Sequence, residues 1–172
     1  MALVIVPLGK QHDRKSFDCG EPALNHYLHQ YANQDIKRRV NRVFVALPPD
    51  EPQQVIGYYS LSTGSLVATD LPEGFPAPSA QVPGPGSPTG AVGCCRIPPG
   101  QGLGTILLAD ALQRIVQASQ SMAVYALAVD ALNDRAAKFY EQFGFIHLPS
   151  QFLKLFLPMD SIPALADELY TP

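Results

Sequence analysis

The sequence predicts a single α/β (α+β) domain over residues 1–172, in which a sheet is flanked by helices. Apolar residues recur at helical steps over residues 21–36 and 103–119. Runs rich in β-branched and aromatic residues, typical of strands, lie at 42–47 and 55–66. A continuous apolar run at 123–129 is typical of a strand that is buried on both faces. Because helical and strand-like segments alternate along the chain, an all-helical or an all-strand fold is excluded.

Length and composition favour one globular domain without a membrane segment. A chain of 172 residues with 47% apolar residues can bury one sizeable core but is short for two. The sequence has no apolar run long enough to cross a bilayer, and a polar stretch follows Leu8 where a signal peptide would continue. We therefore expect a cytoplasmic protein. Its three cysteines, Cys19, Cys94 and Cys95, are too few for a disulfide framework or a four-ligand zinc site, so we expect thiols.

The N-terminal part predicts a strand, a helix and an antiparallel hairpin. The first strand covers residues 3–6 and ends at Pro7, and the helix has Pro22 in its first turn. The hairpin pairs 42–47 with 55–66 around a Pro-rich turn. We expect Gly57 and Gly64 to mark β-bulges in its second strand.

Two histidines on the first helix, His26 and His29, are three residues apart. A metal site needs at least a third ligand, and the neighbouring sequence offers none. We interpret both as solvated or half-buried side chains.

Between residues 71 and 100 the sequence is dense in proline and glycine. Proline lacks the backbone N–H that a strand needs, so we expect no regular strand longer than a few residues here. Only residues 90–97 could be extended, and we treat 76–99 as an irregular segment.

The C-terminal part predicts alternating elements. The run 123–129 should form a central strand. Asn133 can cap the next helix, and Gly144 can end it. The remaining predicted elements are strands at 145–148 and 152–157, the second closed by Pro158, and a terminal helix at 162–169.

A glycine-rich loop, Gly100 to Gly104, opens directly onto the helix predicted at 103–119. The start of a helix presents unpaired N–H groups and the positive end of the helix dipole, and glycines allow a pyrophosphate to approach them closely. The alternative is an ordinary tight turn before a helix.

A basic cluster, which consists of Lys37, Arg38, Arg39 and Arg42, holds 4 of the 12 Lys and Arg residues. The formal net charge of −3 gives no overall attraction to nucleic acid, so only such a local cluster could bind phosphates. The alternative is a solvated helix end, where cations favour the negative pole of the dipole.

Three blocks of the sequence resemble the GNAT acetyltransferase superfamily. They are the Gly102-Leu103-Gly104 loop with its helix, Val129 to Asn133, and Ala136 to Phe145. The most specific feature is the spacing from Asn133, at the end of the second block, through Phe139-Tyr140 to Gly144-Phe145 in the third.

Further motifs resemble the GNAT toxins of bacterial toxin–antitoxin operons. They are Phe17 to Gly20, the helix from Leu24 to Tyr31, Lys37 to Arg39, Val55 to Ser62, Arg135 and Leu155 to Pro158. Toxins of this kind acetylate the amino group of an aminoacyl-tRNA and so stop translation. A small antitoxin of ribbon-helix-helix type holds them silent, and they often dimerise.

The resemblance implies a fold, a cofactor and site residues. The fold would be a mixed, mostly antiparallel, bent sheet flanked by helices, with acetyl-CoA between splayed central strands. Its pyrophosphate would bind the loop of Gln101, Gly102, Leu103, Gly104 and Thr105, and its pantetheine arm would face Asn133. Tyr140 would be the general acid that protonates the departing thiolate, because a phenol of pKa ~10 suits that proton transfer. Without the resemblance, Tyr140 could equally be an aromatic packed beside Phe139 and Phe143.

The sequence departs from the family pattern just before the loop. Pro99 stands where the superfamily has Gln or Arg, and the Pro/Gly-rich stretch replaces the strand whose backbone pairs with the pantetheine amides. We therefore expect weaker binding of acetyl-CoA than a regular strand would give.

Three functions fit these observations. The first is a toxin that acetylates aminoacyl-tRNA, with the basic cluster on the acceptor stem. The second is a GNAT enzyme that acetylates a small-molecule or protein amine. The third is a catalytically impaired GNAT-fold remnant kept for binding, which Pro99 and the missing strand favour, whereas Asn133 and Tyr140 favour an enzyme.

Overall fold

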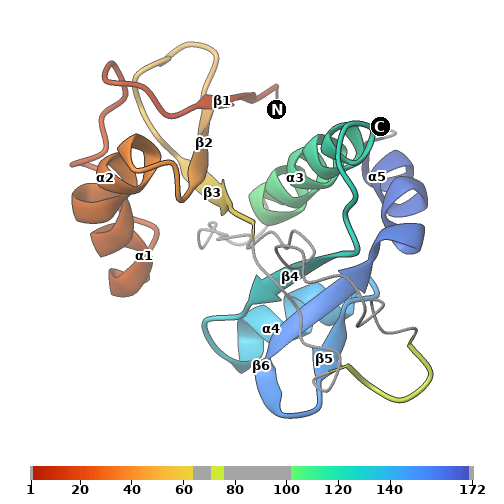
Figure 1. Ribbon diagram of the computed structural model, residues 1–172. Coiled ribbons are helices and arrows are strands. Elements are labelled where there is room, and N and C mark those ends of the chain that lie inside the picture. The colour runs from red at the N-terminus through yellow and green to blue at the C-terminus, as the bar shows by residue number, and fades with distance from the viewer. Residues whose placement is uncertain (1, 64–70, 76–101, 171–172) are drawn as a thin grey trace. The chain divides into compact units, whose positions relative to one another are not determined.

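The computed structural model describes residues 2–63, 71–75 and 102–170 (Figure 1). The chain divides into two compact units, Met1–Leu61 with Val92–Ala111 and Ser62–Ala91 with Leu112–Pro172. We describe each unit by itself, and the single domain over 1–172 stays a prediction. The irregular segment predicted at 76–99, with its possible extended piece and two cysteines, lies outside the described residues.

An antiparallel three-stranded sheet forms the first unit's framework, in the order β1-β2-β3 (Figure 1). Its strands are β1 (Val4–Pro7), β2 (Arg42–Leu47) and β3 (Gly57–Leu61), which confirms the first strand and the hairpin. The bounds differ from the prediction: β1 includes Pro7, and β3 is shorter than the predicted strand at 55–66, because residues 55–56 and 62–63 are not strand. The bulge predicted at Gly57 is wrong, because Gly57 pairs in register with Ala46. A Cβ at Gly57 would lie 2.8 Å from the Leu103 side chain. This glycine therefore allows close approach of a helix, while Gly64 lies outside the described residues.

The helical segment beside this sheet consists of α1 (Pro22–His26), a π-helical turn η1 (Tyr27–Tyr31) and α2 (Ala32–Lys37). Its extent matches the predicted helix, but the π turn was not expected. Leu28 and Ala32 are fully buried and belong to one core cluster with Val45 of β2 and Tyr58 of β3. The Tyr58 hydroxyl donates to the Leu24 carbonyl oxygen at 2.9 Å, which joins α1 to the sheet.

Helix α3 (Leu103–Ser119) matches its predicted bounds. Its part up to Ala111 belongs to the first unit and the rest to the second. Within the first unit, the hydroxyl of the fully buried Tyr59 on β3 donates to the Asp110 carboxylate. Together with the contact at Gly57, this bond fixes the first half of α3 on the sheet.

The second unit contains another antiparallel sheet, with β4 (Ala126–Asp130), β5 (Ile146–Leu148) and β6 (Gln151–Pro158) in the order β4-β6-β5 (Figure 1). Four of the five β4 residues are buried, as the apolar run predicts. Among the described strands, however, β6 lies in the middle and β4 at one edge, whereas we expected β4 to be central.

Helix α4 (Asp134–Glu141) packs on β6. A 3-10 turn η3 (Met159–Ser161) leads into α5 (Ile162–Tyr170), which confirms the predicted terminal helix. Among the described residues, none of the helices has the length and apolar character needed to cross a membrane.

Candidate functional site

The N-terminus of α3 is the predicted site for the pyrophosphate. Gly102 is exposed and has φ +62°, in the region that favours glycine, and a Cβ there would meet no described atom within 4 Å. The next two residues, Leu103 and Gly104, are buried among the described residues. The Ile106 N–H donates to the Gly102 carbonyl oxygen at 3.2 Å. The N–H groups of Leu103, Gly104 and Thr105 precede that bond, where the helix offers them no acceptor. The first turn of α3 contains no acidic residue, so nothing within it repels a pyrophosphate.

Asn133 is the N-cap of α4, as predicted. Its backbone is extended, with φ −159° and ψ −179°, and its side-chain Oδ1 accepts from the Ala136 N–H at 2.9 Å. The residue is exposed. Because the cap uses the oxygen, the amide NH₂ is the part of this side chain that could donate to a carbonyl of the pantetheine arm.

Replacing Asn133 by serine separates these two roles. Serine also caps helices, so Asn133→Ser should keep the free energy of unfolding near the wild-type value but raise KM for acetyl-CoA through loss of the amide donor. Asn133→Ala should additionally lower the free energy of unfolding by about 1 kcal/mol. Thermal unfolding and acetyl-CoA saturation curves measure both effects. If the serine variant has the wild-type KM, Asn133 is only a cap.

Tyr140 lies on α4 and is 2% exposed. Its ring packs edge-on against Phe139 at 5.2 Å and against Phe145 at 5.3 Å between centroids. Tyr140 lies seven positions after Asn133, which is nearly two turns of helix. The two positions are therefore on one side of α4, roughly 10 Å apart along its axis.

A histidine clamp holds the end of α4 against the β5–β6 hairpin. One ring nitrogen of His147 bonds to the Glu141 carboxylate, and the other lies 2.6 Å from the Phe152 carbonyl oxygen. Both partners are acceptors, so the protonated imidazole satisfies both. The hydrogen bond to Glu141, followed by that to Phe152, raises the pKa of His147 above its usual value. Glu141 directly follows Tyr140, so the clamp fixes the turn that carries the proposed acid.

The basic cluster surrounds the end of α2. Lys37, Arg38, Arg39 and Arg42 are all exposed, and none of them pairs with a carboxylate among the described residues. Arg39 has φ +61°, a conformation that usually belongs to glycine. The Arg39 N–H donates to Ile36 and the Val40 N–H to Asp35, each at 3.1 Å, which is the Schellman pattern of a helix end.

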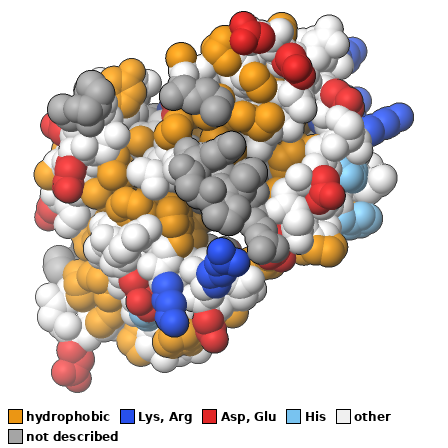
Figure 2. All heavy atoms as spheres, turned by 180° about the vertical axis from the view of Figure 1, so that it is seen from behind, with side chains coloured by type: hydrophobic (Ala, Val, Ile, Leu, Met, Phe, Trp, Pro, Cys, Tyr) orange, Lys and Arg blue, Asp and Glu red, His pale blue; other side chains and the backbone are white. Residues whose placement is uncertain are grey.

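On the face shown in Figure 2, Lys and Arg side chains stand singly or in small groups among acidic ones. This distribution agrees with the net charge of −3. Attraction of an anionic macromolecule must therefore depend on local clusters such as the one at the end of α2.

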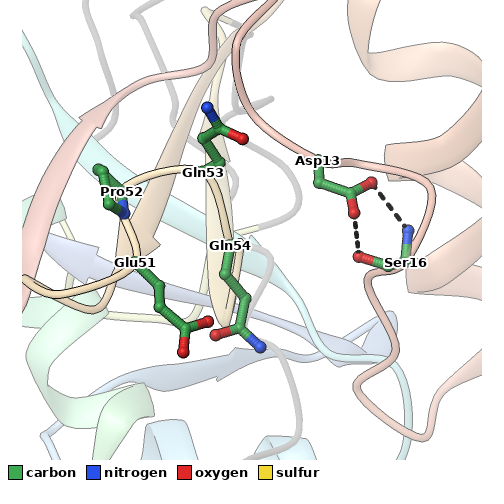
Figure 3. A pocket seen from close by; sticks show the side chains of 6 residues that line it. All are labelled: Asp13, Ser16, Glu51, Pro52, Gln53 and Gln54. Carbon is green, nitrogen blue, oxygen red and sulfur yellow. Dashed lines mark hydrogen bonds between the residues drawn. The ribbon is translucent and has the colours of Figure 1, made fainter.

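A polar hollow of about 470 Å³ lies in the first unit, lined by Asp13, Ser16, Glu51, Pro52, Gln53 and Gln54 (Figure 3). The Asp13 carboxylate is engaged within the loop, because it accepts from the Ser16 hydroxyl at 2.6 Å and from the Ser16 N–H at 3.2 Å. These bonds lower the pKa of Asp13. The hollow contains none of the predicted site residues, so we do not assign the chemistry to it.

The predicted site residues are divided between the two units. The glycine-rich loop and the basic cluster belong to the first unit, and Asn133 and Tyr140 belong to the second. Gln101 lies outside the described residues, as does Pro99. His26 contacts Tyr31, and His29 bonds to the Phe17 carbonyl oxygen at 2.8 Å.

Sequence reasoning missed two supporting pairs, Tyr59 with Asp110 and Glu141 with His147. Each pair joins a helix to a strand. The partners lie 51 residues apart in the first pair and 6 in the second, and neither separation corresponds to a helix or strand period.

The sequence matches a known protein family over most of its length. Residues 12–145 match the family described as the acetyltransferase (GNAT) family. The probable toxin TacT of Sinorhizobium fredii (strain NBRC 101917 / NGR234) is 33% identical over 94% of this chain and 94% of that protein. The tRNA-acetylating toxin of Mycobacterium tuberculosis (strain ATCC 25618 / H37Rv) is 36% identical over 89% of this chain and 90% of that protein.

Solved structures of similar toxins share the fold. AtaTR bound with AcCoA is 30% identical with a TM-score of 0.78, over 95% of this chain and 97% of that one. AtaT complexed with acetyl-methionyl-tRNAfMet is 30% identical with a TM-score of 0.79, over 95% and 99%. A tyrosine-to-phenylalanine mutant of AtaT, bound to the C-terminus of the antitoxin AtaR, is 29% identical with a TM-score of 0.75, over 99% of each chain. The family match over most of the sequence and these similarities over nearly the whole chain show that the protein belongs to the GNAT acetyltransferase family.

Proposed function

We propose that this protein is an acetyl-CoA-dependent N-acetyltransferase that acetylates the amino group of an aminoacyl-tRNA and thereby blocks translation. The observation that carries the proposal is its 36% identity to a tRNA-acetylating toxin over 89% of the chain. The N-terminus of α3 at Gly102, the capped helix α4 and the exposed basic cluster support the proposal as candidate sites for the cofactor, the acid and the tRNA.

The proposed loop for the cofactor's pyrophosphate is Gln101 to Thr105, of which Gly102 to Thr105 are described. The described part supports this proposal, since Gly102 is exposed and the first-turn N–H groups of α3 have no acceptor within the helix. The amide of Asn133 would bind the pantetheine arm. Acetyl-CoA supplies the activated acetyl thioester.

Tyr140 is the proposed catalytic acid. In the reaction a C–N bond forms between the amine and the acetyl carbon, the C–S bond breaks, and the amine gives one proton to solvent water. The phenol of Tyr140 gives its proton to the departing sulfur and regains one from solvent. The rings of Phe139 and Phe145 hold the phenol in one orientation. AtaT and KacT have each been solved as a tyrosine-to-phenylalanine mutant, which supports a role for a tyrosine in such toxins.

The partners follow from this function. Lys37, Arg38, Arg39 and Arg42 would bind tRNA phosphates. A protein that acts on charged tRNA would work in the cytoplasm, so we propose that location. An antitoxin would restrain the enzyme, and the resemblance implies that this antitoxin is of ribbon-helix-helix type. The enzyme could also form a homodimer. Structures of AtaT with part of the antitoxin AtaR, and of a KacTA–DNA complex, support an antitoxin partner.

A transfer assay tests the function. The protein is incubated with acetyl-labelled acetyl-CoA and either aminoacyl-tRNA, uncharged tRNA or free amino acids. We expect label only on the aminoacyl-tRNA, released as an N-acetyl amino acid when the ester is hydrolysed. Equal labelling of free amines would favour a small-molecule acetyltransferase, and no labelling of any acceptor would favour a remnant.

Arg39 offers a separate prediction. A non-glycine residue in the left-handed region costs stability, so Arg39→Gly should raise the free energy of unfolding by about 0.5–1 kcal/mol. The same change removes one proposed phosphate contact and should raise KM for charged tRNA. Denaturant unfolding and tRNA saturation curves measure the two effects. A stabilised variant with unchanged KM would remove Arg39 from the tRNA surface.

A further inference from the structure

The π-helical turn η1 places two aromatic rings together on the exposed side of the first helical segment. The Ala32 N–H donates to the Tyr27 carbonyl oxygen, five residues back, as a π turn requires. Residues five apart therefore share a face, and the rings of His26 and Tyr31 meet at 5.2 Å with an interplanar angle of 74°. Both residues are exposed, and Tyr31 is 49% accessible.

The inner side of the same turn is anchored in the core. Leu28 is fully buried, and the Tyr27 ring stacks on Tyr58 at 6.2 Å and 19°. The Tyr27 hydroxyl donates to Asp35 at 3.1 Å and accepts from the Asn41 amide at 2.7 Å. Burial raises the pKa of Tyr27 to about 12, so this hydroxyl stays protonated. The aromatic pair is consequently held in place rather than presented on a loose helix.

The exposed pair continues into the basic cluster. Tyr31, Gln34 and Arg38 are all exposed and occupy positions i, i+3 and i+7, which lie on one helix face. The Tyr27 hydroxyl bonds both to Asp35 on α2 and to Asn41 in the turn before β2. These two hydrogen bonds hold the turn that connects Arg38 with Arg42. An aromatic ring and several cations thus form one rigid, solvent-facing surface within the first unit.

We propose that Tyr31 is a nucleobase-stacking residue, on which a base of the unpaired 3′ end of tRNA lies while Lys37 and Arg38 bind neighbouring phosphates. Proteins read single-stranded RNA by stacking bases on aromatic side chains beside cations. Because Lys37 and Arg38 have no carboxylate partner within the part of the chain that the structure describes, the surface is positively charged, which favours RNA as its partner. The proposal rests on the proposed function, because tRNA is the substrate that it orients.

A fluorescence titration tests stacking directly. The chain contains no tryptophan, so Tyr31→Trp gives a protein with a single indole. The control is Tyr170→Trp, because Tyr170 is 68% exposed at the end of α5. We expect intact tRNA to quench the indole at position 31 in a saturable way, and tRNA trimmed of its single-stranded 3′ end, or the control variant, to show little quenching. Equal quenching by intact and trimmed tRNA would overturn the proposal.

Kinetics give a second test. Tyr31→Ala should raise KM for charged tRNA by about tenfold and leave kcat and KM for acetyl-CoA unchanged, while Tyr31→Phe keeps the ring and the wild-type KM. An alanine variant with the wild-type KM overturns the proposal. So does an alanine variant that loses only antitoxin binding, since the surface would then be a protein interface. The titration needs no acetyl transfer, so it tests stacking even where wild-type protein fails to label aminoacyl-tRNA.

Discussion

Replacing Tyr140 by phenylalanine is expected to lower kcat for acetyl transfer by about 10²-fold or more while the protein stays folded. Phenylalanine keeps the ring contacts with Phe139 and Phe145 and loses only the hydroxyl. KM for both substrates should change little, because the proton is given in the transition state rather than in the bound complex. Steady-state kinetics over a range of each substrate separates kcat from KM.

Tyr170→Phe is the matched control for this experiment, because Tyr170 lies 68% exposed on α5. The control should keep wild-type kcat. Thermal unfolding of both variants shows whether a loss of activity reflects chemistry or folding. Unchanged turnover in Tyr140→Phe would remove this tyrosine from the reaction and return it to a packing role.

Neutralising the end of α2 is expected to raise KM for charged tRNA by at least about tenfold and to flatten its dependence on salt. The variant is Lys37→Ala with Arg38→Ala and Arg39→Gly, the glycine preserving the left-handed turn at residue 39. Each lost phosphate contact should reduce the slope of log affinity against log salt by about 0.7–0.9. KM for acetyl-CoA and the temperature of thermal unfolding should stay unchanged.

The control replaces three other exposed lysines, Lys10, Lys15 and Lys138, by alanine, so that the net charge changes equally. If both triple variants lose the same affinity, the effect is general electrostatics rather than a specific surface. If the α2 variant unfolds at a clearly lower temperature than the control, the cluster supports folding.

Strongly periodic segments could be predicted from the sequence. The apolar period of residues 103–119 and the β-branched run of 42–47 coincide with α3 and β2, because each pattern matches only one backbone geometry. Asn133 and Gly144 were identifiable because a cap side chain and a positive φ, here +90° at Gly144, each favour few residue types.

Features that depend on tertiary packing could not be predicted. The π turn follows from burying Leu28 while Tyr27 stacks on Tyr58, contacts made with strands far along the chain. A glycine in a strand can mark either a β-bulge or the close approach of another element, and the sequence does not distinguish the two. At Gly57 the nearby Leu103 side chain shows that close approach is the reason. Among the described strands, β6 lies in the middle because it pairs with both β4 and β5. The composition of a single strand does not show which strands will pair with it.

The roles proposed for the loop, Asn133 and Tyr140 require that acetyl-CoA binds to this chain, in which Pro99 replaces the Gln or Arg of the family. A calorimetric titration of the folded wild-type protein with acetyl-CoA measures that binding, with Gly104→Val as the comparison, since a β-branched side chain in the first turn of α3 would crowd the phosphate-binding N–H groups. We predict saturable binding at one site in the wild type and clearly weaker binding in a variant that unfolds at a similar temperature. A folded wild-type protein that releases no heat with acetyl-CoA, or two proteins of equal affinity, would contradict the assignment of this loop and of the reaction built on it.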